Sequence, residues 1–270
     1  MTDDDYVLRD RDKEEISRLE LQHNVWKSET DSVVRKAGFK PGDRLLDMGS
    51  GPGFLTFDLA DLVGPSGSVL ALDNSEFFIE HLRREARTQH LNWVRGEVAD
   101  ISEFEYEESS LDGAISRWVL MFLSDPEVVL ARIAGALRPG GTFAAMEYIQ
   151  FKSMSLWPEG PNFRRLYDAV HDLIARFGGD ADIGGRIPGL LQRTGFEVVE
   201  LFPILRVGRS GSPLWIWLDA ATRNHPNLIE AGLLSAPELD AFEDEWAARS
   251  KDPTAFFTAP PVLATIAHKR

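Results

Sequence analysis

A glycine-rich segment near the start of the chain carries residue types that can hold a nucleotide-like ligand. Asp47 ends a short apolar run, and Gly49, Gly51 and Gly53 follow it at every second position. Glycines let a ligand approach the backbone closely, and the helix expected directly after them offers unpaired N–H groups. A second apolar run ends in another acid, Asp73, whose carboxylate can accept hydrogen bonds from two ribose hydroxyls. The combination predicts a cofactor that contains adenosine.

The order of the glycines distinguishes two classes of cofactor. A dinucleotide-binding loop has the order Gly-x-Gly-x-x-Gly, whereas the third glycine here comes one residue earlier and Pro52 stiffens the turn. Asp47 stands two residues before the first glycine, where its charge would repel a pyrophosphate. The same charge suits the ammonium group of S-adenosylmethionine, which the spacing therefore favours. The alternative is a tight turn without a ligand, and the backbone entropy lost by three clustered glycines argues against it.

Strands and helices alternate around this loop. Short apolar runs predict strands, and apolar residues at three- or four-residue spacing predict helices. Such alternation implies a parallel sheet with helices on both faces, so we expect an α/β, Rossmann-like three-layer sandwich. The expected strands are 44–47, 68–73, 92–95, 111–116 and 142–148, and the expected helices are 14–37, 54–62, 75–89 and 126–137.

The pattern changes after residue 150. Residues 151–180 have mainly helical spacing, and a short helix at 187–193 leads into a strand at 196–205. A long insertion, 209–256, precedes a final apolar strand at 262–267. We expect a single domain over 1–270, made of an N-terminal helical lid (1–40), a cofactor-binding core (41–150) and two substrate-cap insertions (151–195 and 209–256).

Residues 45–150 resemble the class I S-adenosylmethionine-dependent methyltransferases. The segment 45–53 is similar to their first motif, 69–74 to their second, 137–142 to the turn before their fifth strand, and 96–101 to their adenine-contacting segment, with Glu97 in place of the usual aspartate. The segments 19–26 and 117–123 resemble the small-molecule branch of that superfamily. The resemblance implies a mostly parallel seven-stranded sheet with an antiparallel last strand, S-adenosylmethionine as the cofactor and methyl transfer as the reaction.

The expected cofactor contacts come from these motifs and from their neighbours. Arg117 follows the fourth strand and either pairs with the methionine carboxylate or forms a surface ion pair. Gln22 and Trp26 share one face of the first helix and either close over the cofactor or, for Trp26, anchor the helix to the core. Phe54 either touches the cofactor or packs in the core. The full set is Gln22, Trp26, Asp47, Gly49, Ser50, Gly51, Gly53, Phe54, Asp73, Asn74, Glu97, Val98 and Arg117.

Methyl transfer from a sulfonium needs in-line alignment and exclusion of water more than covalent help. A base is required where the acceptor is a hydroxyl or a protonated amine. Glu147, at the end of the fifth strand, is the first candidate, against the alternative of a hydrogen-bonded structural acid. His171 is the second candidate, although it falls on the flank of its helix, and His225 is either a base or a turn residue.

Aromatic residues in the two variable segments either line an apolar pocket or pack within a helical cap. They are Trp157, Phe177, Trp215 and Trp217. The sequence contains no His-x-x-x-His motif and no convincing carboxylate cluster, so we expect no metal site.

Composition narrows the partners and the location. Twenty-nine basic against forty-three acidic residues give a net charge of −14, which repels phosphate backbones and anionic lipids. We therefore expect neither a nucleic-acid nor a membrane partner, and no apolar run approaches the ~20 residues that span a bilayer. The chain has no cysteine and begins with an acidic segment rather than a secretory signal, so we expect a cytoplasmic protein. The sequence leaves a homodimer open.

The expected function is S-adenosylmethionine-dependent methyl transfer to an O, N or C atom of a small molecule. Two variable segments that leave little room for a macromolecule favour a small acceptor. The alternatives are another chemistry on the same fold, such as a cyclase or a decarboxylase, and a cofactor-binding module without catalysis.

Overall fold

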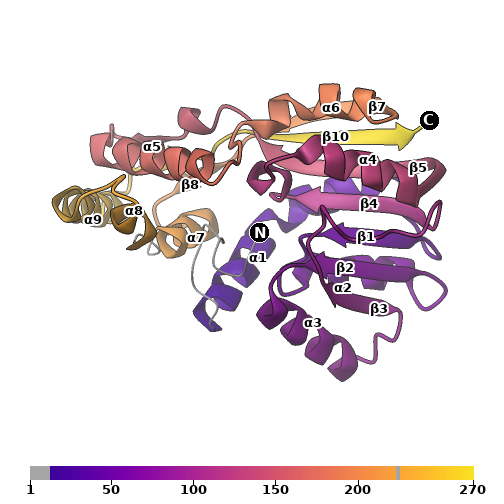
Figure 1. The fold of residues 1–270 in the computed structure, drawn as a ribbon. Coiled ribbons are helices and arrows are strands. Elements are labelled where there is room, and N and C mark those ends of the chain that lie inside the picture. Colours follow the sequence, from indigo (N-terminus) through magenta and orange to yellow (C-terminus); the bar gives the residue numbers. More distant parts are fainter. Residues whose placement is uncertain (1–12, 223–225) are drawn as a thin grey trace.

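A seven-stranded sheet organises the protein, whose computed structural model describes residues 13–222 and 226–270 (Figure 1). The strand order is β3-β2-β1-β4-β5-β10-β7. β10 runs antiparallel to both of its neighbours, and the pairs among β1 to β5 are parallel, which confirms the expected sheet. The strands are β1 (Arg44–Met48), β2 (Ser68–Asp73), β3 (Val94–Val98), β4 (Leu111–Arg117), β5 (Leu137–Tyr148), β7 (Phe196–Ile204) and β10 (Val262–Lys269).

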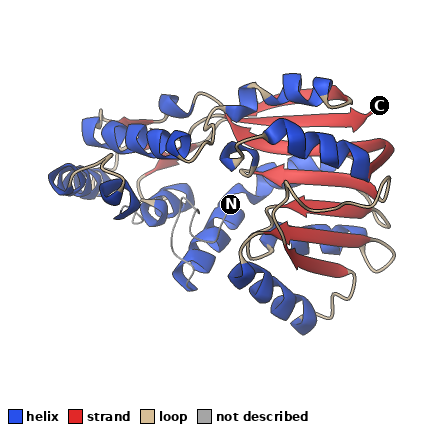
Figure 2. Cartoon of the chain, in the orientation of Figure 1, coloured by secondary structure: helices blue, strands red, loops and turns tan. Residues whose placement is uncertain are grey.

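Helices cover both faces of this sheet (Figure 2). They are α1 (Lys13–Lys36), α2 (Phe54–Val63), α3 (Glu76–Thr88), α4 (Pro126–Ala136) and α6 (Ile187–Arg193). Side-chain caps start two of them, because the Ser75 hydroxyl accepts from the Phe78 amide and the Asp125 carboxylate accepts from the Val128 amide. The predicted helices begin and end within a few residues of their expected positions. α6 packs against β7 and α4, in the layer beside the sheet.

A second group of elements lies beside the carboxyl ends of the parallel strands. It contains α5 (Pro161–Arg176), α7 (Pro213–Ala221), α8 (Pro226–Glu230) and α9 (Ala236–Ser250). It also contains a three-stranded antiparallel sheet of β6 (Ser155–Trp157), β9 (Phe256–Thr258) and β8 (Val207–Arg209). The sequence reading missed this sheet because strands of three residues are too short to show alternation.

Helix α1 lies between the large sheet and this second group (Figure 1). Trp26 on α1 is fully buried, with its ring centroid 5.2 Å from that of Trp118 and 6.2 Å from that of Trp217. The guanidinium of Arg206 lies 5.4 Å from the centre of the Trp26 ring, at cation–π distance. Because Trp118 follows β4 and Trp217 belongs to α7, Trp26 joins the two parts of the molecule.

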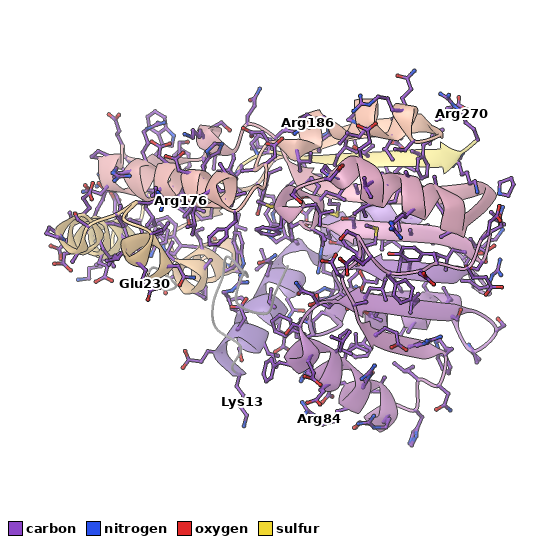
Figure 3. The ribbon with its side chains drawn as sticks, viewed as in Figure 1. Lys13, Arg84, Arg176, Arg186, Glu230 and Arg270 are labelled. Atoms are coloured by element: carbon purple, nitrogen blue, oxygen red, sulfur yellow. The ribbon has the colours of Figure 1, made fainter. Side chains whose placement is uncertain are left out.

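Charged side chains occupy the outside of the molecule. The six charged residues labelled in Figure 3, Lys13, Arg84, Arg176, Arg186, Glu230 and Arg270, are all exposed. Within 13–222 and 226–270, no helix is both long and apolar enough to cross a bilayer.

Candidate functional site

A cavity of about 340 Å³ opens at the carboxyl ends of β1 and β4. The connections after these two neighbouring strands lead away in opposite directions, which is where ligands bind in open α/β sheets. The part lined by the segments that follow β1, β2 and β3 contains the predicted cofactor contacts, and we call it the cofactor half. The part lined by α5, α7, α8 and the end of β5 is called the acceptor half, after the role proposed for it below.

The glycine-rich loop has a backbone shape that only glycine adopts easily. Gly49 and Gly53 have φ angles of +61° and +97°, in the left-handed region. A Cβ atom on Gly49 would lie 2.5 Å from a Val119 methyl, and one on Gly53 would lie 2.7 Å from Leu82 Cγ. These two glycines therefore let the loop pack against the segment after β4 on one side and against α3 on the other.

Asp73 fixes this loop while part of its carboxylate stays free for a ligand. Its Oδ2 accepts from the Gly51 amide at 2.8 Å, and its Oδ1 accepts from the Ser75 amide at 2.9 Å. Burial raises the pKa of Asp73, and the two amide donors act in the opposite direction. A carboxylate has about four lone-pair sites, so two more acceptor positions remain on this cavity wall. They suit two ribose hydroxyls.

Asp47 lies deeper, at the end of β1. Its Oδ2 accepts from the Thr56 hydroxyl at 2.6 Å, and it also lines the cavity. Burial raises the pKa of Asp47 to about 6, although the Thr56 hydrogen bond and the positive charge of Arg117 lower it. A buried carboxyl with this pKa is stabilised in its charged form by any cation that enters the cavity.

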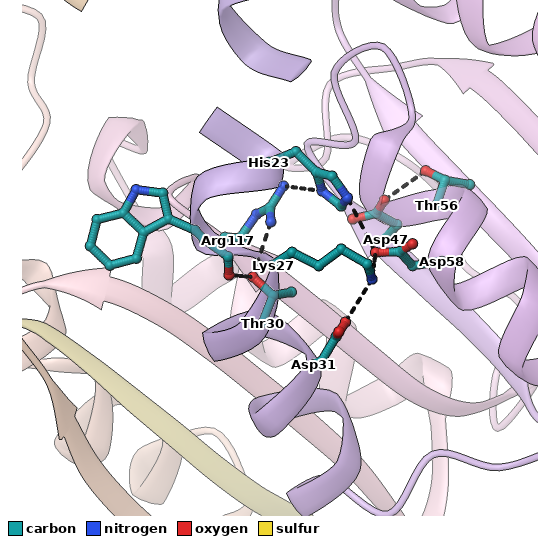
Figure 4. Close-up of polar contacts among 9 residues, drawn as sticks. His23, Lys27, Thr30, Asp31, Asp47, Thr56, Asp58 and Arg117 are labelled. Atoms are coloured by element: carbon teal, nitrogen blue, oxygen red, sulfur yellow. Dashed lines mark hydrogen bonds and ion pairs between the residues drawn. The ribbon is translucent and has the colours of Figure 1, made fainter. Parts of the chain in front are cut away.

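Arg117 belongs to a polar chain that connects α1 to α2 (Figure 4). It donates to the Thr30 hydroxyl at 3.1 Å and lies 3.4 Å from Nδ1 of His23. His23 Nε2 in turn lies 3.3 Å from Asp58, which also accepts from Lys27 at 2.8 Å. Arg117 also lines the cavity, so its place does not match the alternative of a surface ion pair. Pairing with a carboxylate of the cofactor stays a prediction.

Gln22 and Trp26 have different surroundings. Gln22 lines the cavity, and its Oε1 accepts from Arg18 at 2.9 Å and from the Trp217 indole at 3.2 Å. Trp26 is absent from the described cavity wall, since its neighbours enclose it completely. The predicted cofactor contact of Trp26 is therefore replaced by the alternative, in which it anchors α1.

The residues predicted to contact adenine, Glu97 and Val98, do not line the cavity, and the three residues after them do. Glu97 forms ion pairs with Arg83 at 3.4 Å and with Arg95 at 2.6 Å, and Val98 is 43% exposed. Neither residue lines the cavity. Ala99, Asp100 and Ile101 line it instead, because β3 extends to Val98 and only the residues after a strand end reach the site edge. The strand expected at 92–95 lies at Val94–Val98, so Glu97 and Val98, which the resemblance placed at the adenine, belong to the strand itself.

The predicted cofactor residues divide as follows. The described cavity wall includes Gln22, Asp47, Gly49, Ser50, Gly51, Phe54, Asp73, Asn74 and Arg117, and it does not include Trp26, Gly53, Glu97 and Val98. Direct contact of the lining residues with a cofactor stays a prediction.

Glu147 lies outside the cavity, in a fully buried site behind the segment that follows β4. Its Oε1 accepts from the amides of Val119 and Leu120, both at 2.8 Å. Burial raises the pKa of Glu147 to about 7, and these backbone donors act in the opposite direction. These surroundings match the alternative of a structural acid, and the role of Glu147 as the base stays a prediction.

His171 does not line the described cavity either, although its ring centroid is 6.2 Å from that of the lining residue Phe151. It lies on the flank of α5, where Nδ1 is 3.3 Å from Asp172 and Nε2 is 3.8 Å from Asp182. The structure therefore gives His171 no contact with a bound acceptor. His225 lies outside the described residues.

The acceptor half is apolar with a few polar groups. Its wall includes Phe151, Met154, Leu166, Val170, Leu173, Ile174, Leu218 and Leu228, together with Tyr148 and Tyr167. Of the four aromatic residues proposed for it, only Trp217 is on the described wall. Trp157 and Phe177 are 51% and 44% exposed, and Trp215 stacks on Trp246 at 4.2 Å.

The fold and the site together define a Rossmann-like protein with an adenosine-type cofactor half and an apolar acceptor half. The family model described as "Methyltransferase domain" matches residues 39–171. Residues 39–171 are therefore a methyltransferase domain of the class I, S-adenosylmethionine-dependent type, and S-adenosylmethionine is the cofactor of this class.

Similar proteins agree with this assignment. An uncharacterised 37.1 kDa protein in transposon TN4556 of Streptomyces fradiae is 33% identical over 84% of this chain and 63% of its own. A 2-phytyl-1,4-naphtoquinone methyltransferase of Trichormus variabilis is 29% identical over 50% of this chain and 61% of its own. The chain thus spans less than two thirds of the length of these two relatives.

Two further similar proteins are covered over more of their own length. Nocamycin O-methyltransferase of Saccharothrix syringae is 27% identical over 84% of this chain and 83% of its own. The structure of a Bacillus halodurans protein described as a putative methyltransferase superposes with a TM-score of 0.61 at 14% identity, over 90% of this chain and 99% of the other. This superposition supports the fold alone.

Asp47 is expected to make cofactor binding depend on pH. Below pH 6 Asp47 is mostly protonated in the free protein, and a cationic ligand favours its charged form, so binding releases a proton there. The affinity for S-adenosylmethionine should fall as the pH falls below 6, by up to about tenfold per unit, and should level off near pH 7. Calorimetry in buffers of different ionisation enthalpy measures the released proton. Asp47→Asn should abolish both effects, and wild-type binding at pH 5.5 without proton release would contradict the assignment.

Glu147→Gln tests whether this acid is structural. Its folded pKa of about 7 lies above the ordinary 4.5, so the folded state binds the extra proton and loses stability as the pH rises from 4.5 to 7. The loss is on the order of 3 kcal/mol for such a shift. The glutamine variant should therefore gain stability relative to wild type between pH 5 and pH 8 in urea titrations.

The exposed Glu197, replaced by glutamine, is the control and should show no such gain. Turnover of the Glu147→Gln enzyme should stay within a few-fold of wild type, because the glutamine oxygen can still accept from the amides of Val119 and Leu120 and the side chain does not line the described cavity. A loss of a hundredfold or more would restore Glu147 as the general base.

Proposed function

We propose that the protein transfers the methyl group of S-adenosylmethionine to an apolar small molecule. The observation that carries the proposal is one cavity with two unlike halves, a carboxylate-bearing cofactor half and an apolar acceptor half. The names of two relatives also support the proposal, because one is a naphthoquinone methyltransferase and the other is an O-methyltransferase.

Bound S-adenosylmethionine supplies an electrophilic methyl group on a positively charged sulfur. Asp73 would accept hydrogen bonds from the ribose hydroxyls, and Asp47 and Arg117 would pair with the ammonium and carboxylate groups. α1, α5 and α7 enclose the acceptor and exclude water from the reaction. In this proposal the chain provides binding, alignment and a dry environment, which is what an in-line displacement requires.

The proposal is tested first by binding and then by transfer. S-adenosylhomocysteine should bind in calorimetry, and Asp73→Asn should weaken it about a hundredfold because two charge-assisted hydrogen bonds are lost. The exposed Asp61 on α2, replaced by asparagine, is the matched control and should bind normally. With methyl-labelled cofactor, label should enter organic-soluble small molecules. Absence of cofactor binding, label only in protein or RNA, or turnover of an acceptor without S-adenosylhomocysteine would overturn the proposal.

A bulky side chain in the acceptor half should impair use of the acceptor without changing the affinity for the cofactor. Val170 lines that half from α5, so Val170→Trp should lower kcat/KM for the acceptor at least tenfold and leave the Kd of S-adenosylhomocysteine unchanged. Arg164→Trp adds the same side chain to an exposed position of α5 and should change neither quantity. Equal losses in both variants would show that the assigned acceptor half is not where the acceptor binds.

A further inference from the structure

Two tyrosines supply polar groups to the apolar acceptor half. Tyr148 ends β5 and Tyr167 lies on α5, and both line the cavity. Phe151 packs between them, with its ring centroid 5.5 Å from that of Tyr148 and 6.4 Å from that of Tyr167. Tyr148 is 9% exposed and Tyr167 is half-buried, and within the described part of the chain neither hydroxyl has a hydrogen-bond partner. A buried phenol that lines a cavity without a partner is available to a ligand.

Both hydroxyls are donors at neutral pH. Burial raises the pKa of Tyr148 above that of an ordinary phenol; the charge of Glu147 raises it further, and that of Arg18 lowers it. Burial also raises the pKa of Tyr167 well above its usual value. These groups are therefore protonated and cannot take a proton from an acceptor, but they can donate hydrogen bonds to it.

The rest of the described wall offers no base beside the acceptor. It contains no histidine, glutamate or lysine, and its carboxylates, Asp47, Asp73 and Asp100, all lie in the cofactor half. Its two guanidinium groups are already engaged, because Arg18 pairs with Glu15 at 2.7 Å and Arg117 is assigned to the cofactor. An acceptor half with two phenol donors and no base suits a molecule that enters already ionised.

We propose that the acceptor is a mainly apolar molecule with an acidic hydroxyl, a phenol or an enol conjugated to a carbonyl, and that it binds as its oxyanion with Tyr148 and Tyr167 donating hydrogen bonds to it. This inference rests on the proposed methyl transfer. The hydroxyl proton goes to solvent before the acceptor is enclosed. A lone pair of the delocalised anion then forms the bond to the methyl carbon, and the electrons of the C–S bond move to sulfur, which leaves a neutral thioether.

The charge balance favours this arrangement. An isolated anion in an apolar cavity is strongly disfavoured, but the sulfonium of the cofactor has the opposite charge and would lie in the same cavity. The two phenol donors replace part of the water that the anion loses. A neutral alcohol would gain less from the sulfonium charge and from the phenol hydrogen bonds, and it would still need a base.

The test uses 4-nitrophenol, a phenol that ionises near neutral pH, and its neutral methyl ether as the matched probe. The protein is saturated with sinefungin, an analogue that cannot transfer a methyl group and carries a charged amine where the cofactor has its sulfonium, and the visible absorbance of the bound hydroxy probe is followed against pH. The pKa of the bound probe should fall at least one unit below its value in water. At pH 8 the hydroxy probe should bind at least tenfold more tightly than the ether.

Tyr148→Phe and Tyr167→Phe should each weaken the hydroxy probe about tenfold and raise its bound pKa, with little effect on the ether. Tyr106→Phe is the control, because Tyr106 is another buried tyrosine whose hydroxyl has no partner in the described structure but which does not line the cavity. Unchanged affinity for S-adenosylhomocysteine and an unchanged Tm show that each variant is folded.

The inference is overturned if the bound probe has the same or a higher pKa than free probe, if the ether binds as tightly, or if neither probe binds the cofactor-loaded protein. If the wild-type protein does not bind S-adenosylhomocysteine at all, the result is a different one, because it would overturn the methyltransferase proposal itself.

Discussion

The buried carboxylate of Glu147 holds the segment on which both halves of the cavity depend. By accepting from the amides of Val119 and Leu120, it fixes the chain directly after β4. Trp118, just before these amides, has a φ angle of +56°, a left-handed conformation that is costly for a side chain of this size. The hydrogen bond from the Trp118 amide to Met146 and the contacts of its ring stabilise that conformation.

This fixed segment connects parts of the molecule that are far apart in sequence. Val119 fills the space beside Gly49 in the cofactor half, and the Trp118 ring stacks on Tyr148 in the acceptor half at 5.7 Å. The other side of Trp118 meets Trp26 of α1. A carboxylate that touches no ligand therefore determines how the loop, the lid helix and the acceptor half meet.

The two halves of the cavity use opposite physical principles. In the cofactor half, carboxylates and backbone amides give directional contacts, and burial strengthens each of them. In the acceptor half, apolar side chains remove water and impose shape, and few polar groups set orientation. The polar chain Arg117–His23–Asp58–Lys27 and the Gln22–Trp217 hydrogen bond attach α1 to the core and to α7, so one helix borders both environments.

The sequence alone determined the sheet core and the position of the cofactor half. Backbone conformation and strand ends there are encoded locally, by Gly49, Gly53, Asp73 and the N-cap Ser75, so short-range patterns were sufficient. Only the tertiary structure decided that Glu147 does not line the described cavity, that Trp26 is core and that Asp100 rather than Glu97 is on the cavity wall. Each of these outcomes depends on which elements meet in space or on where a strand ends. The lining of the acceptor half was the part that the sequence predicted least well. It is assembled from β5, α5, α7 and α8, whose side chains become neighbours only after the chain has folded.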